Sequence, residues 1–482
     1  MIFNSLPFFI FFTIFFILYW FVFNKNLKLQ NCLLLIGSYI FYSWWDWRLL
    51  PLLIGYTSIN YLLGYYIDKA TKPQTKRFFV FLGCFTGIGL LFYFKYVNFF
   101  ITSLASAFAK FNISLNIHTM NIILPLGISF YTFRTLSYII DIKNKKLKPT
   151  SNWVAFFSFV AFFPCLLSGP IDKAKTLMPQ LERNREFKYD EAADALRQIL
   201  WGLFKKIVIA DSLAEVTDNI FSNYQHFRGS GLLLGAFYYS IQMYTDFSGY
   251  SDMAIGVGRL LGFDVTRNFN YPFFAQNVAE FWRRWHMSLT SWLTDYVFTP
   301  LSIAFRNYGK FGLIMAIIIN LTLIGIWHGA NWTFAVFGLL HGCYFIPLIL
   351  KGTINKKKKI DPNKSMPTLI EFLNMLKTFT LVTFALVIFR SDSVSNAFGF
   401  IKGIFSKSLL MPPGIGKPIC IPLIIVFLII EWIQRDKRHV LQIQNIKYTG
   451  MRWGIYILLL ITIIIVYPPD VQKNKAFIYV KF

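Results

Sequence analysis

The chain of 482 residues carries 48 lysines and arginines against 23 aspartates and glutamates, a formal net charge of +25 at pH 7. Hydrophobic residues make up 55% and charged residues 15%, and the mean hydropathy is +0.50, whereas soluble domains carry about 25% charged residues. These values exclude a soluble enzyme. They also exclude disordered, collagen-like and disulfide-framework proteins, which need an excess of charge, glycine or cysteine. We expect an all-α polytopic membrane protein.

The positive charge is divided among short loops between apolar runs. The positive-inside rule produces this distribution in a multi-pass protein, so no nucleic-acid partner is needed to explain it. The first apolar run, Ile2–Phe23, has no basic residue before it and no typical cleavage site after it, and Lys25 and Lys28 follow. We therefore expect an uncleaved span with an extracytoplasmic N-terminus.

Further apolar runs predict spans that alternate so that the basic loops fall on the cytoplasmic side. They are Cys32–Trp45, Leu49–Ile67, Phe78–Phe94, Ile122–Ile140, Phe311–Ile326, Phe334–Leu350, Leu369–Phe389, Ile419–Ile433 and Trp453–Tyr467. The mixed-charge stretch Asp172–Arg197 is expected to be an interfacial amphipathic segment. We expect roughly eleven to thirteen transmembrane or re-entrant helices in one membrane domain, residues 1–482, with the tail Pro468–Phe482 outside the cytoplasm.

Three clusters of polar residues interrupt the apolar sequence, where a charge at the bilayer centre costs about 2.5–3.5 kcal/mol. In the first cluster, Gln242 and Asp246 are four residues apart, as are Ser248 and Asp252, so each pair shares a helix face. Such faces either line an aqueous cavity or hold neighbouring helices together. The sequence leaves both interpretations open.

The other two clusters contain histidines. Trp282-Arg-Arg-Trp-His286 combines arginines and tryptophans as membrane interfaces do, but an interfacial anchor does not explain its imidazole. Trp327-His328-Gly-Ala-Asn-Trp332 breaks a long hydrophobic stretch. A buried neutral imidazole there is able to accept a proton from a hydroxyl, although a histidine that is only hydrogen-bonded in the core is the commoner case.

The remaining histidines indicate no metal site. His341 follows His328 by thirteen residues, which is outside the spacing of a zinc-binding helix pair. His118, His226 and His439 lie near loop ends and are expected at the surface.

These motifs resemble the membrane-bound O-acyltransferase (MBOAT) family, and within it the bacterial alginate and peptidoglycan O-acetyltransferases. Besides the two histidine clusters, the resemblance rests on the run Tyr244-Thr-Asp-Phe-Ser-Gly-Tyr-Ser-Asp-Met-Ala-Ile-Gly256, and it covers nearly the whole chain. It implies helices around a central tunnel, with His328 as the catalytic base and His286 as a second catalytic histidine in that tunnel. The residues implied to shape the tunnel or bind substrate are Asn331, Trp332, Asp246, Trp282 and Arg283.

The end of the chain, Phe477-Ile-Tyr479-Val-Lys-Phe482, has an F-x-Y-x-x-F pattern. Such an aromatic tail either docks as a plug against the helices or, by analogy with acyl-relay motifs of the family, carries the acyl group as an ester on Tyr479. Val480 and Lys481 depart from the residues that are common in that motif. Both interpretations stay open.

The resemblance implies an O-acetyltransferase of the bacterial cytoplasmic membrane. It would take an acetyl group from cytoplasmic acetyl-CoA, with no bound cofactor, and pass it on for O-acetylation of an extracytoplasmic polysaccharide of the alginate or peptidoglycan type. Its expected partners are an extracytoplasmic O-acetyltransferase, the polysaccharide acceptor and membrane lipids. One alternative is D-alanyl transfer from a carrier protein to teichoic acid, which usually has its tyrosine motif on a separate chain. The other is a transporter or flippase, which the lack of an apparent inverted repeat disfavours.

Overall fold

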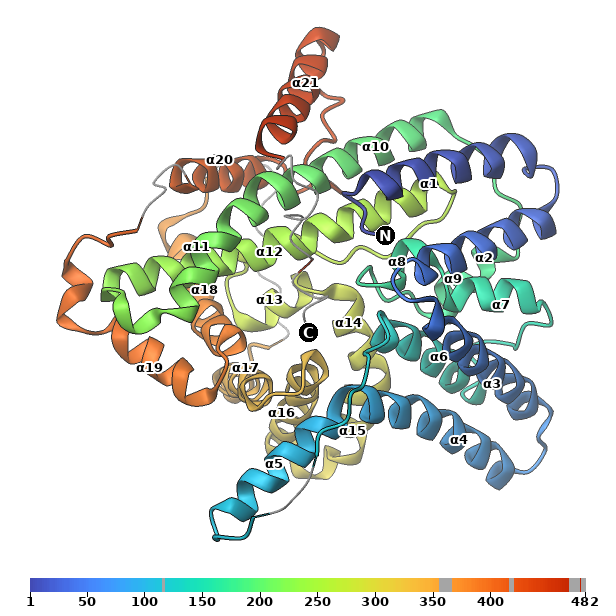
Figure 1. The fold of residues 1–482 in the computed structure, drawn as a ribbon, viewed down its shortest axis with the longest axis horizontal. Helices are drawn as coiled ribbons and strands as arrows, with labels where there is room; N and C mark the ends of the chain where they lie inside the picture. Colours follow the sequence, from blue (N-terminus) through green and yellow to red (C-terminus); the bar gives the residue numbers. More distant parts are fainter. Residues whose placement is uncertain (115–117, 355–365, 416–419, 468–476, 478–482) are drawn as a thin grey trace. The chain divides into compact units, whose positions relative to one another are not determined.

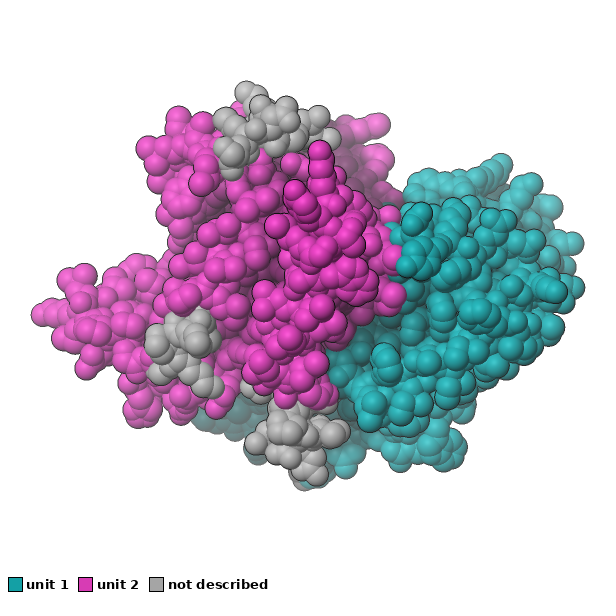
Figure 2. All heavy atoms as spheres, turned by 90° about the horizontal axis from the view of Figure 1, so that it is seen from above, with its two compact units in different colours: residues 1–192, 257–266 teal, residues 193–256, 267–482 magenta. Residues whose placement is uncertain are grey.

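The computed structural model describes residues 1–114, 118–354, 366–415, 420–467 and 477, and these residues form helices and loops without a β-strand (Figure 1). Their contacts divide the chain into two compact units, residues 1–192 with 257–266 and residues 193–256 with 267–482, which Figure 2 colours separately. Helices α10 (Tyr189–Leu203) and α12 (Gly229–Leu260) contribute residues to both units. The predicted all-α architecture is confirmed.

The first unit contains the helices of the amino-terminal part of the chain. They are α1 Leu6–Ile17, α2 Leu27–Ser43, α3 Leu50–Lys69, α4 Pro73–Leu91, α5 Val97–Ala109, α6 Ile128–Lys143, α7 Trp153–Val160, α8 Phe163–Leu166 and α9 Ala174–Leu181. Polar side chains define several starts: Ser5 and Asn26 cap α1 and α2 by accepting hydrogen bonds from backbone N–H groups of the first turn. A π-helical turn, Phe92–Tyr96, joins α4 to α5.

The predicted span Ile122–Ile140 is wrong at its beginning, because helix α6 starts only at Ile128. Pro125 disfavours helical backbone in the residue before it. Gly127 adopts a left-handed backbone with φ of 71°, and a Cβ there would collide with the carbonyl oxygen of Leu166. The predicted span began too early because it was based on hydropathy alone, which does not report this turn.

The predicted interfacial segment Asp172–Arg197 is partly wrong, since its first half belongs to the core of the first unit. Asp172 is fully buried, and its Oδ1 accepts hydrogen bonds from the backbone N–H and the hydroxyl of Thr266, at 3.0 and 2.5 Å. Burial raises the pKa of the Asp172 carboxyl above its ordinary value, although the Thr266 bonds act against this. Arg185 is also buried and donates to Asn31 Oδ1 at 2.6 Å.

The second unit contains the helices that carry the histidine clusters. They are α11 Asp211–Ser222, α13 Val278–Arg284, α14 Met287–Leu293, α15 Thr299–Ala304, α16 Gly309–His328, α17 Trp332–Leu350, α18 Leu369–Arg390, α19 Val394–Ile404, α20 Cys420–Ile433 and α21 Thr449–Val466. Helices α16 and α17 lie side by side as a hairpin (Figure 1). They can approach closely because Gly325 and Gly338 carry no Cβ. A Cβ at either position would collide with a backbone oxygen of the other helix.

Five described runs are long and apolar enough to cross a membrane: Pro73–Ala109, Arg306–His328, Trp332–Leu350, Leu369–Arg390 and Thr449–Val466. Two shorter apolar helices, Leu6–Val22 and Ile421–Ile433, accompany them. The chain is therefore a multi-pass membrane protein, as predicted. The number of roughly eleven to thirteen crossing or re-entrant helices stays a prediction.

Candidate functional site

His328 is the last residue of α16 and lies at the turn of the α16–α17 hairpin, where its side chain is 5% exposed. The chain becomes helical again because Asn331 caps α17, its Oδ1 accepting from the backbone N–H of Thr333 at 3.1 Å. The Asn331 Nδ2 donates to the carbonyl oxygen of Asp392 at 2.8 Å. Asn331, predicted to shape the tunnel, thus holds the turn that positions His328.

His286 lies between α13 and α14 and is 1% exposed. Its backbone is left-handed, with φ of 43° and ψ of 52°, which costs a non-glycine residue about 1–3 kcal/mol. Its Nδ1 lies 3.0 Å from Oδ1 of Asn268. Burial lowers the pKa of the His286 imidazole to about 3, so this ring is neutral at physiological pH.

One indole ring joins the two predicted histidines. The centre of the Trp327 ring lies 6.0 Å from that of His286 and 4.9 Å from that of His328. Phe247 packs edge-on against His286 at 4.7 Å, and Phe389 packs against His328 at 5.1 Å. The structure therefore brings both histidines into one buried aromatic group.

A third histidine, which sequence reasoning did not include in the site, belongs to the same group. Trp282 Nε1 donates to His341 Nδ1 at 3.2 Å, and both side chains are buried. The Phe337 ring lies 4.7 Å from His341 and 6.3 Å from His328. The sequence feature that could have included His341 in the site is its position within an otherwise apolar helix.

Two consecutive lysines are the partners of the predicted acidic residues. They lie in a π-helical stretch, Phe204–Ala210, between α10 and α11. Lys206 Nζ is 2.6 Å from Asp246 Oδ1, and Lys205 Nζ is 2.6 Å from Asp252 Oδ2. The polar side of α12 therefore binds a neighbouring helical segment, which was one of the two open interpretations.

The Lys206 ammonium is charged although its side chain is only 2% exposed. Burial by itself lowers its pKa, but Asp246 and a second carboxylate, Asp211 at 2.9 Å, more than offset this and raise the pKa above its ordinary value. Gln242, on the same helix as Asp246, accepts a hydrogen bond of 2.5 Å from Thr217 Oγ1. Asp246, another predicted tunnel residue, is thus held within a network between helices.

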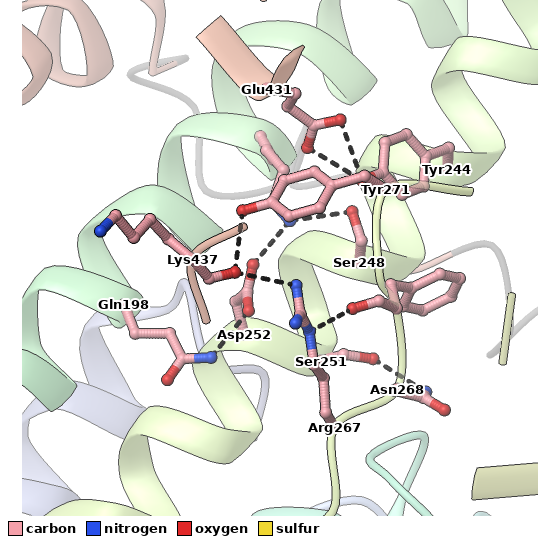
Figure 3. Close-up of polar contacts among 12 residues, drawn as sticks. Gln198, Tyr244, Ser248, Ser251, Asp252, Arg267, Asn268, Tyr271, Glu431 and Lys437 are labelled. Carbon is pink, nitrogen blue, oxygen red and sulfur yellow. Dashed lines mark hydrogen bonds and ion pairs between the residues drawn. The ribbon is translucent and has the colours of Figure 1, made fainter. Parts of the chain in front are cut away.

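A polar cavity of about 20 Å³ lies beside the Lys205 ion pair, and this volume fits about one water molecule. Figure 3 shows the residues around it: the Tyr244 hydroxyl donates to both oxygens of Glu431, at 2.9 and 3.0 Å. On the other side, Asn268 Nδ2 donates to Ser251 Oγ at 3.0 Å. Since Asn268 also contacts His286, the cavity wall and the histidine group share a residue.

The expectation for His439 is wrong, because this residue is buried in the second unit, 3% exposed. Its Nε2 lies 3.1 Å from Asp194 Oδ1, and Gln442 donates to the other oxygen of that carboxylate at 3.3 Å. Asp194 is distant along the chain, so the sequence offered no sign of this pair. His118 and His226 are exposed, as expected.

Two predicted tunnel residues have exposed side chains. Arg283 is exposed and donates to the carbonyl oxygen of Ile354 at 3.3 Å. Trp332, the first residue of α17, is 60% exposed. Trp282, by contrast, is buried within the aromatic group around Trp327.

Tyr479, the predicted acyl relay, lies outside the described residues. Two positions before it, Phe477 is described and is 2% exposed. Its ring lies 4.5 Å from that of Tyr250 at an angle of 83°, and Lys206 Nζ lies 4.5 Å from its centre, within the range of a cation–π attraction. The Phe477 side chain thus packs beside the buried ion pairs of the second unit.

The sequence matches the family model for MBOAT, the membrane-bound O-acyltransferase family, over residues 85–354, a stretch that includes His286 and His328. The chain is 38% identical over 380 residues to the probable alginate O-acetylase AlgI of Azotobacter vinelandii, covering 79% of this chain and 73% of the relative. It is 33% identical over 414 residues to the peptidoglycan O-acetyltransferase of Helicobacter pylori, covering 79% and 74%. Its identity to the teichoic acid D-alanyltransferase of Streptococcus thermophilus is 31% over 313 residues, covering 61% and 74%.

Proposed function

The chain belongs to the membrane-bound O-acyltransferase family and is an acyltransferase, and from this premise we propose that it transfers acetyl groups for O-acetylation of an extracytoplasmic polysaccharide. The observation that carries the proposal is the similarity to alginate and peptidoglycan O-acetyltransferases over 79% of the chain. Both names point to an acceptor that is a polysaccharide bearing free hydroxyl groups. The polymer is therefore of the alginate or peptidoglycan type.

In the proposed reaction His328 is the general base. The acceptor hydroxyl gives its proton to the imidazole while its oxygen attacks the carbonyl carbon of an acetyl thioester. The C–S bond breaks and the proton passes to the departing thiolate, so that an ester and a free thiol result. His286 orients the donor or the acceptor, and the contact of both rings with Trp327 supports a shared site.

We propose cytoplasmic acetyl-CoA as the donor, used as a substrate and not held as a cofactor. The enzyme would lie in the bacterial cytoplasmic membrane with both termini outside, an orientation that the basic loops between apolar runs support. The donor then binds from the cytoplasmic side of a tunnel through the helices. The acetyl group leaves on the other side to an extracytoplasmic O-acetyltransferase, which modifies the polysaccharide, while membrane lipids surround the helices.

Tyr479 is proposed to carry the acetyl group as a phenolic ester between the histidines and the partner. The burial of Phe477, two residues before Tyr479, against Tyr250 and beside Lys206 supports this role. A tail that only docks would have the same attachment and would never become acetylated.

D-Alanyl transfer to teichoic acid is the second candidate, and the relative with that name favours it. That relative has 31% identity over 61% of this chain, against 38% over 79% for the alginate relative. The tyrosine motif also lies on this same chain. Both observations favour acetyl transfer. A transporter or flippase would bind a substrate without forming an ester, which family membership disfavours.

Mass spectrometry of the C-terminal peptide tests the proposal. The purified full-length protein is incubated with acetyl-CoA beside His328→Ala and the control His226→Ala, whose histidine is exposed. We expect an acetyl group on Tyr479 in the wild type and the control, and none in His328→Ala. If free CoA is released with the partner present but no acetyl-tyrosine forms, the relay is wrong and the acetyltransferase stands. D-Alanyl transfer with no use of acetyl-CoA would overturn the proposed donor.

A further inference from the structure

The side-chain amide of Asn268 lies at the centre of a buried set of hydrogen bonds. Asn268 is 0% exposed. Its Oδ1 lies 3.0 Å from His286 Nδ1 and accepts from the Ser288 hydroxyl at 2.9 Å. Its Nδ2 donates to Ser251 Oγ at 3.0 Å, on α12 (Figure 3). The amide therefore connects the α13–α14 junction with α12.

The neighbours of this amide determine which of its atoms faces His286. The backbone N–H of Ser288, which can only donate, also points at the Asn268 Oδ1, at 3.4 Å. The atom on this side is thus the amide oxygen, which only accepts. The ring nitrogen that faces it, His286 Nδ1, must carry a hydrogen. In a neutral imidazole the other nitrogen, Nε2, then holds the lone pair.

We propose that Asn268 is a positioning residue of the acyl-transfer site. It holds His286 as the Nδ1–H tautomer, so that Nε2 orients the acyl donor by accepting a hydrogen bond from one of its N–H or O–H groups, while the attacking hydroxyl gives its proton to His328. Asn268 acts through His286 and does not itself touch substrate. The role of Nε2 rests on the proposed function, whereas the tautomer itself can be tested without any transfer reaction.

The backbone around Asn268 supports this assignment, because it holds the left-handed turn at His286. Met287 N donates to the Asn268 carbonyl at 2.8 Å, and Asn270 N donates to the Arg284 carbonyl at 2.9 Å. These two bonds lie on either side of the strained residue. The rings of Phe247 and Trp327 restrict the rotation of the His286 imidazole, since their centres lie 4.7 and 6.0 Å from its centre. The imidazole is therefore fixed in orientation as well as in tautomer.

The charged and titratable groups on the surrounding elements are paired with other groups or lie beyond an aromatic ring. They are Asp246 with Lys206, Asp252 with Lys205, Glu280 with Arg284, Arg267 on the Phe269 carbonyl, and His328 on the other side of Trp327. The neutral Asn268 amide is bonded to Nδ1 of the His286 ring. A charge introduced at position 268 would therefore act directly on this imidazole.

The first test compares Asn268→Asp and Asn268→Leu by measuring kcat/KM for acetyl transfer across pH. A carboxylate at position 268 still accepts from Nδ1–H, and its second oxygen accepts from the Ser251 hydroxyl where the Asn268 Nδ2 had donated to it. The carboxylate favours the imidazolium and so raises the pKa of His286. We expect Asn268→Asp to be near wild type at high pH and to lose activity progressively at low pH, where Nε2 becomes protonated. Asn268→Leu should lose about 10- to 100-fold at every pH, as when outer partners of metal-binding histidines are removed.

Asn270→Asp and Asn270→Leu are the matched controls. Asn270 lies two positions along the same segment, and its bonds to Arg284 use backbone atoms: its N–H donates to the Arg284 carbonyl, and its carbonyl accepts from Arg284 Nη1. Both controls should keep the wild-type pH profile. A new loss of activity at low pH in Asn270→Asp would show that the effect is a general one of charge, and an unchanged pH profile in Asn268→Asp would overturn the proposal.

The second test measures the tautomer itself by nitrogen NMR of full-length protein labelled at histidine, with His286→Gln to assign the signals. We expect a protonated Nδ1 and an unprotonated Nε2 for His286 in the wild type, and loss of this preference in Asn268→Leu. A hydrogen on Nε2 in the wild type would overturn the proposal even if acetyl transfer is active. The expected tautomer in a protein that transfers no acetyl group would instead remove the proposed function and retain the role of Asn268 in orienting His286.

Discussion

Lys206 and Asp246 form a buried ion pair, with Nζ and Oδ1 2.6 Å apart and side-chain exposures of 2% and 3%. Removing the lysine deprives a buried carboxylate of this cation, so Lys206→Met is expected to destabilise the protein by about 3–5 kcal/mol. Thermal unfolding of the purified protein measures the loss. Lys206→Met combined with Asp246→Leu should recover part of it, because the uncompensated charge is then absent.

Lys188→Met is the control for this prediction. Lys188 pairs with Glu191 at 3.0 Å, but the two side chains are 62% and 59% exposed. Exposed pairs contribute little, so the unfolding temperature should stay close to that of the wild type. Equal unfolding temperatures for Lys206→Met and Lys188→Met would contradict the importance of burial.

The close approach of α16 and α17 gives a prediction for Gly325. A Cβ there would meet the backbone oxygen of Phe334, which cannot move aside as a flexible side chain does. Gly325→Ala should therefore cost about 1–3 kcal/mol by overpacking and should also reduce acyl transfer, because the hairpin positions His328. Gly454→Ala on α21 is the control, since a Cβ there meets no atom within 4 Å. A Gly325→Ala variant as stable and active as the control would show that the hairpin tolerates separation.

His328→Ala should lower kcat for acyl transfer by about 10²–10⁴-fold if this histidine is the general base. The unfolding temperature must be measured in parallel, because the side chain is buried between Trp327 and Phe389. His328→Gln retains more of the volume and separates packing from proton transfer. Substantial activity in a folded His328→Gln variant would remove this residue from the proposed chemistry.

Asp172 predicts a dependence of stability on pH. Burial raises the pKa of its carboxyl in the folded state above the ordinary value of 3.8, so the unfolded chain releases this proton first as pH rises. Its contribution to stability therefore falls from pH 3.8 up to the raised pKa and is constant above it. Asp172→Asn should remove this decline while its Oδ1 still accepts from Thr266. Unfolding temperatures at several pH values test this, with Asp436→Asn as the exposed control.

Phe477 predicts the behaviour of the tail. Phe477→Ala removes the ring that packs on Tyr250 and lies beside Lys206, so these contacts two residues before Tyr479 are lost. Acetylation of Tyr479 should then fall about ten-fold or more, as expected when a reacting group is no longer held in place. Tyr250→Phe, which retains a ring against Phe477, should be milder. Full acetylation of the tail in Phe477→Ala would mean that this contact does not guide the relay.

Hydropathy predicted the long apolar helices closely. The runs Leu369–Phe389 and Ile419–Ile433 correspond to α18, Leu369–Arg390, and α20, Cys420–Ile433. These helices are defined by apolar side chains that follow one another, which is local information. The start of α6 instead depends on the backbone conformation of Gly127, and there the prediction failed.

The same distinction explains the site. His286 and His328 were recognisable because an imidazole is unusual in apolar sequence. Their surroundings were not, because Asn268 and the lysines Lys205 and Lys206 lie in segments without a distinctive pattern. Their importance arises from contacts between residues far apart along the chain, such as the 2.6 Å bond from Lys205 to Asp252.

The π-helical stretch Phe204–Ala210 has a consequence for the register of this region. Successive side chains of an α-helix diverge by about 100°, yet Lys205 and Lys206 both reach carboxylates on α12. The wider turn of a π-helix contains one extra residue, and this geometry lets the adjacent side chains of Lys205 and Lys206 both contact α12. Deleting a single residue here would return the chain to ordinary helical geometry and rotate one ammonium group away from α12. The stretch therefore fixes the register of the two lysines against α12, and the two ion pairs depend on the number of its residues as well as on their identity.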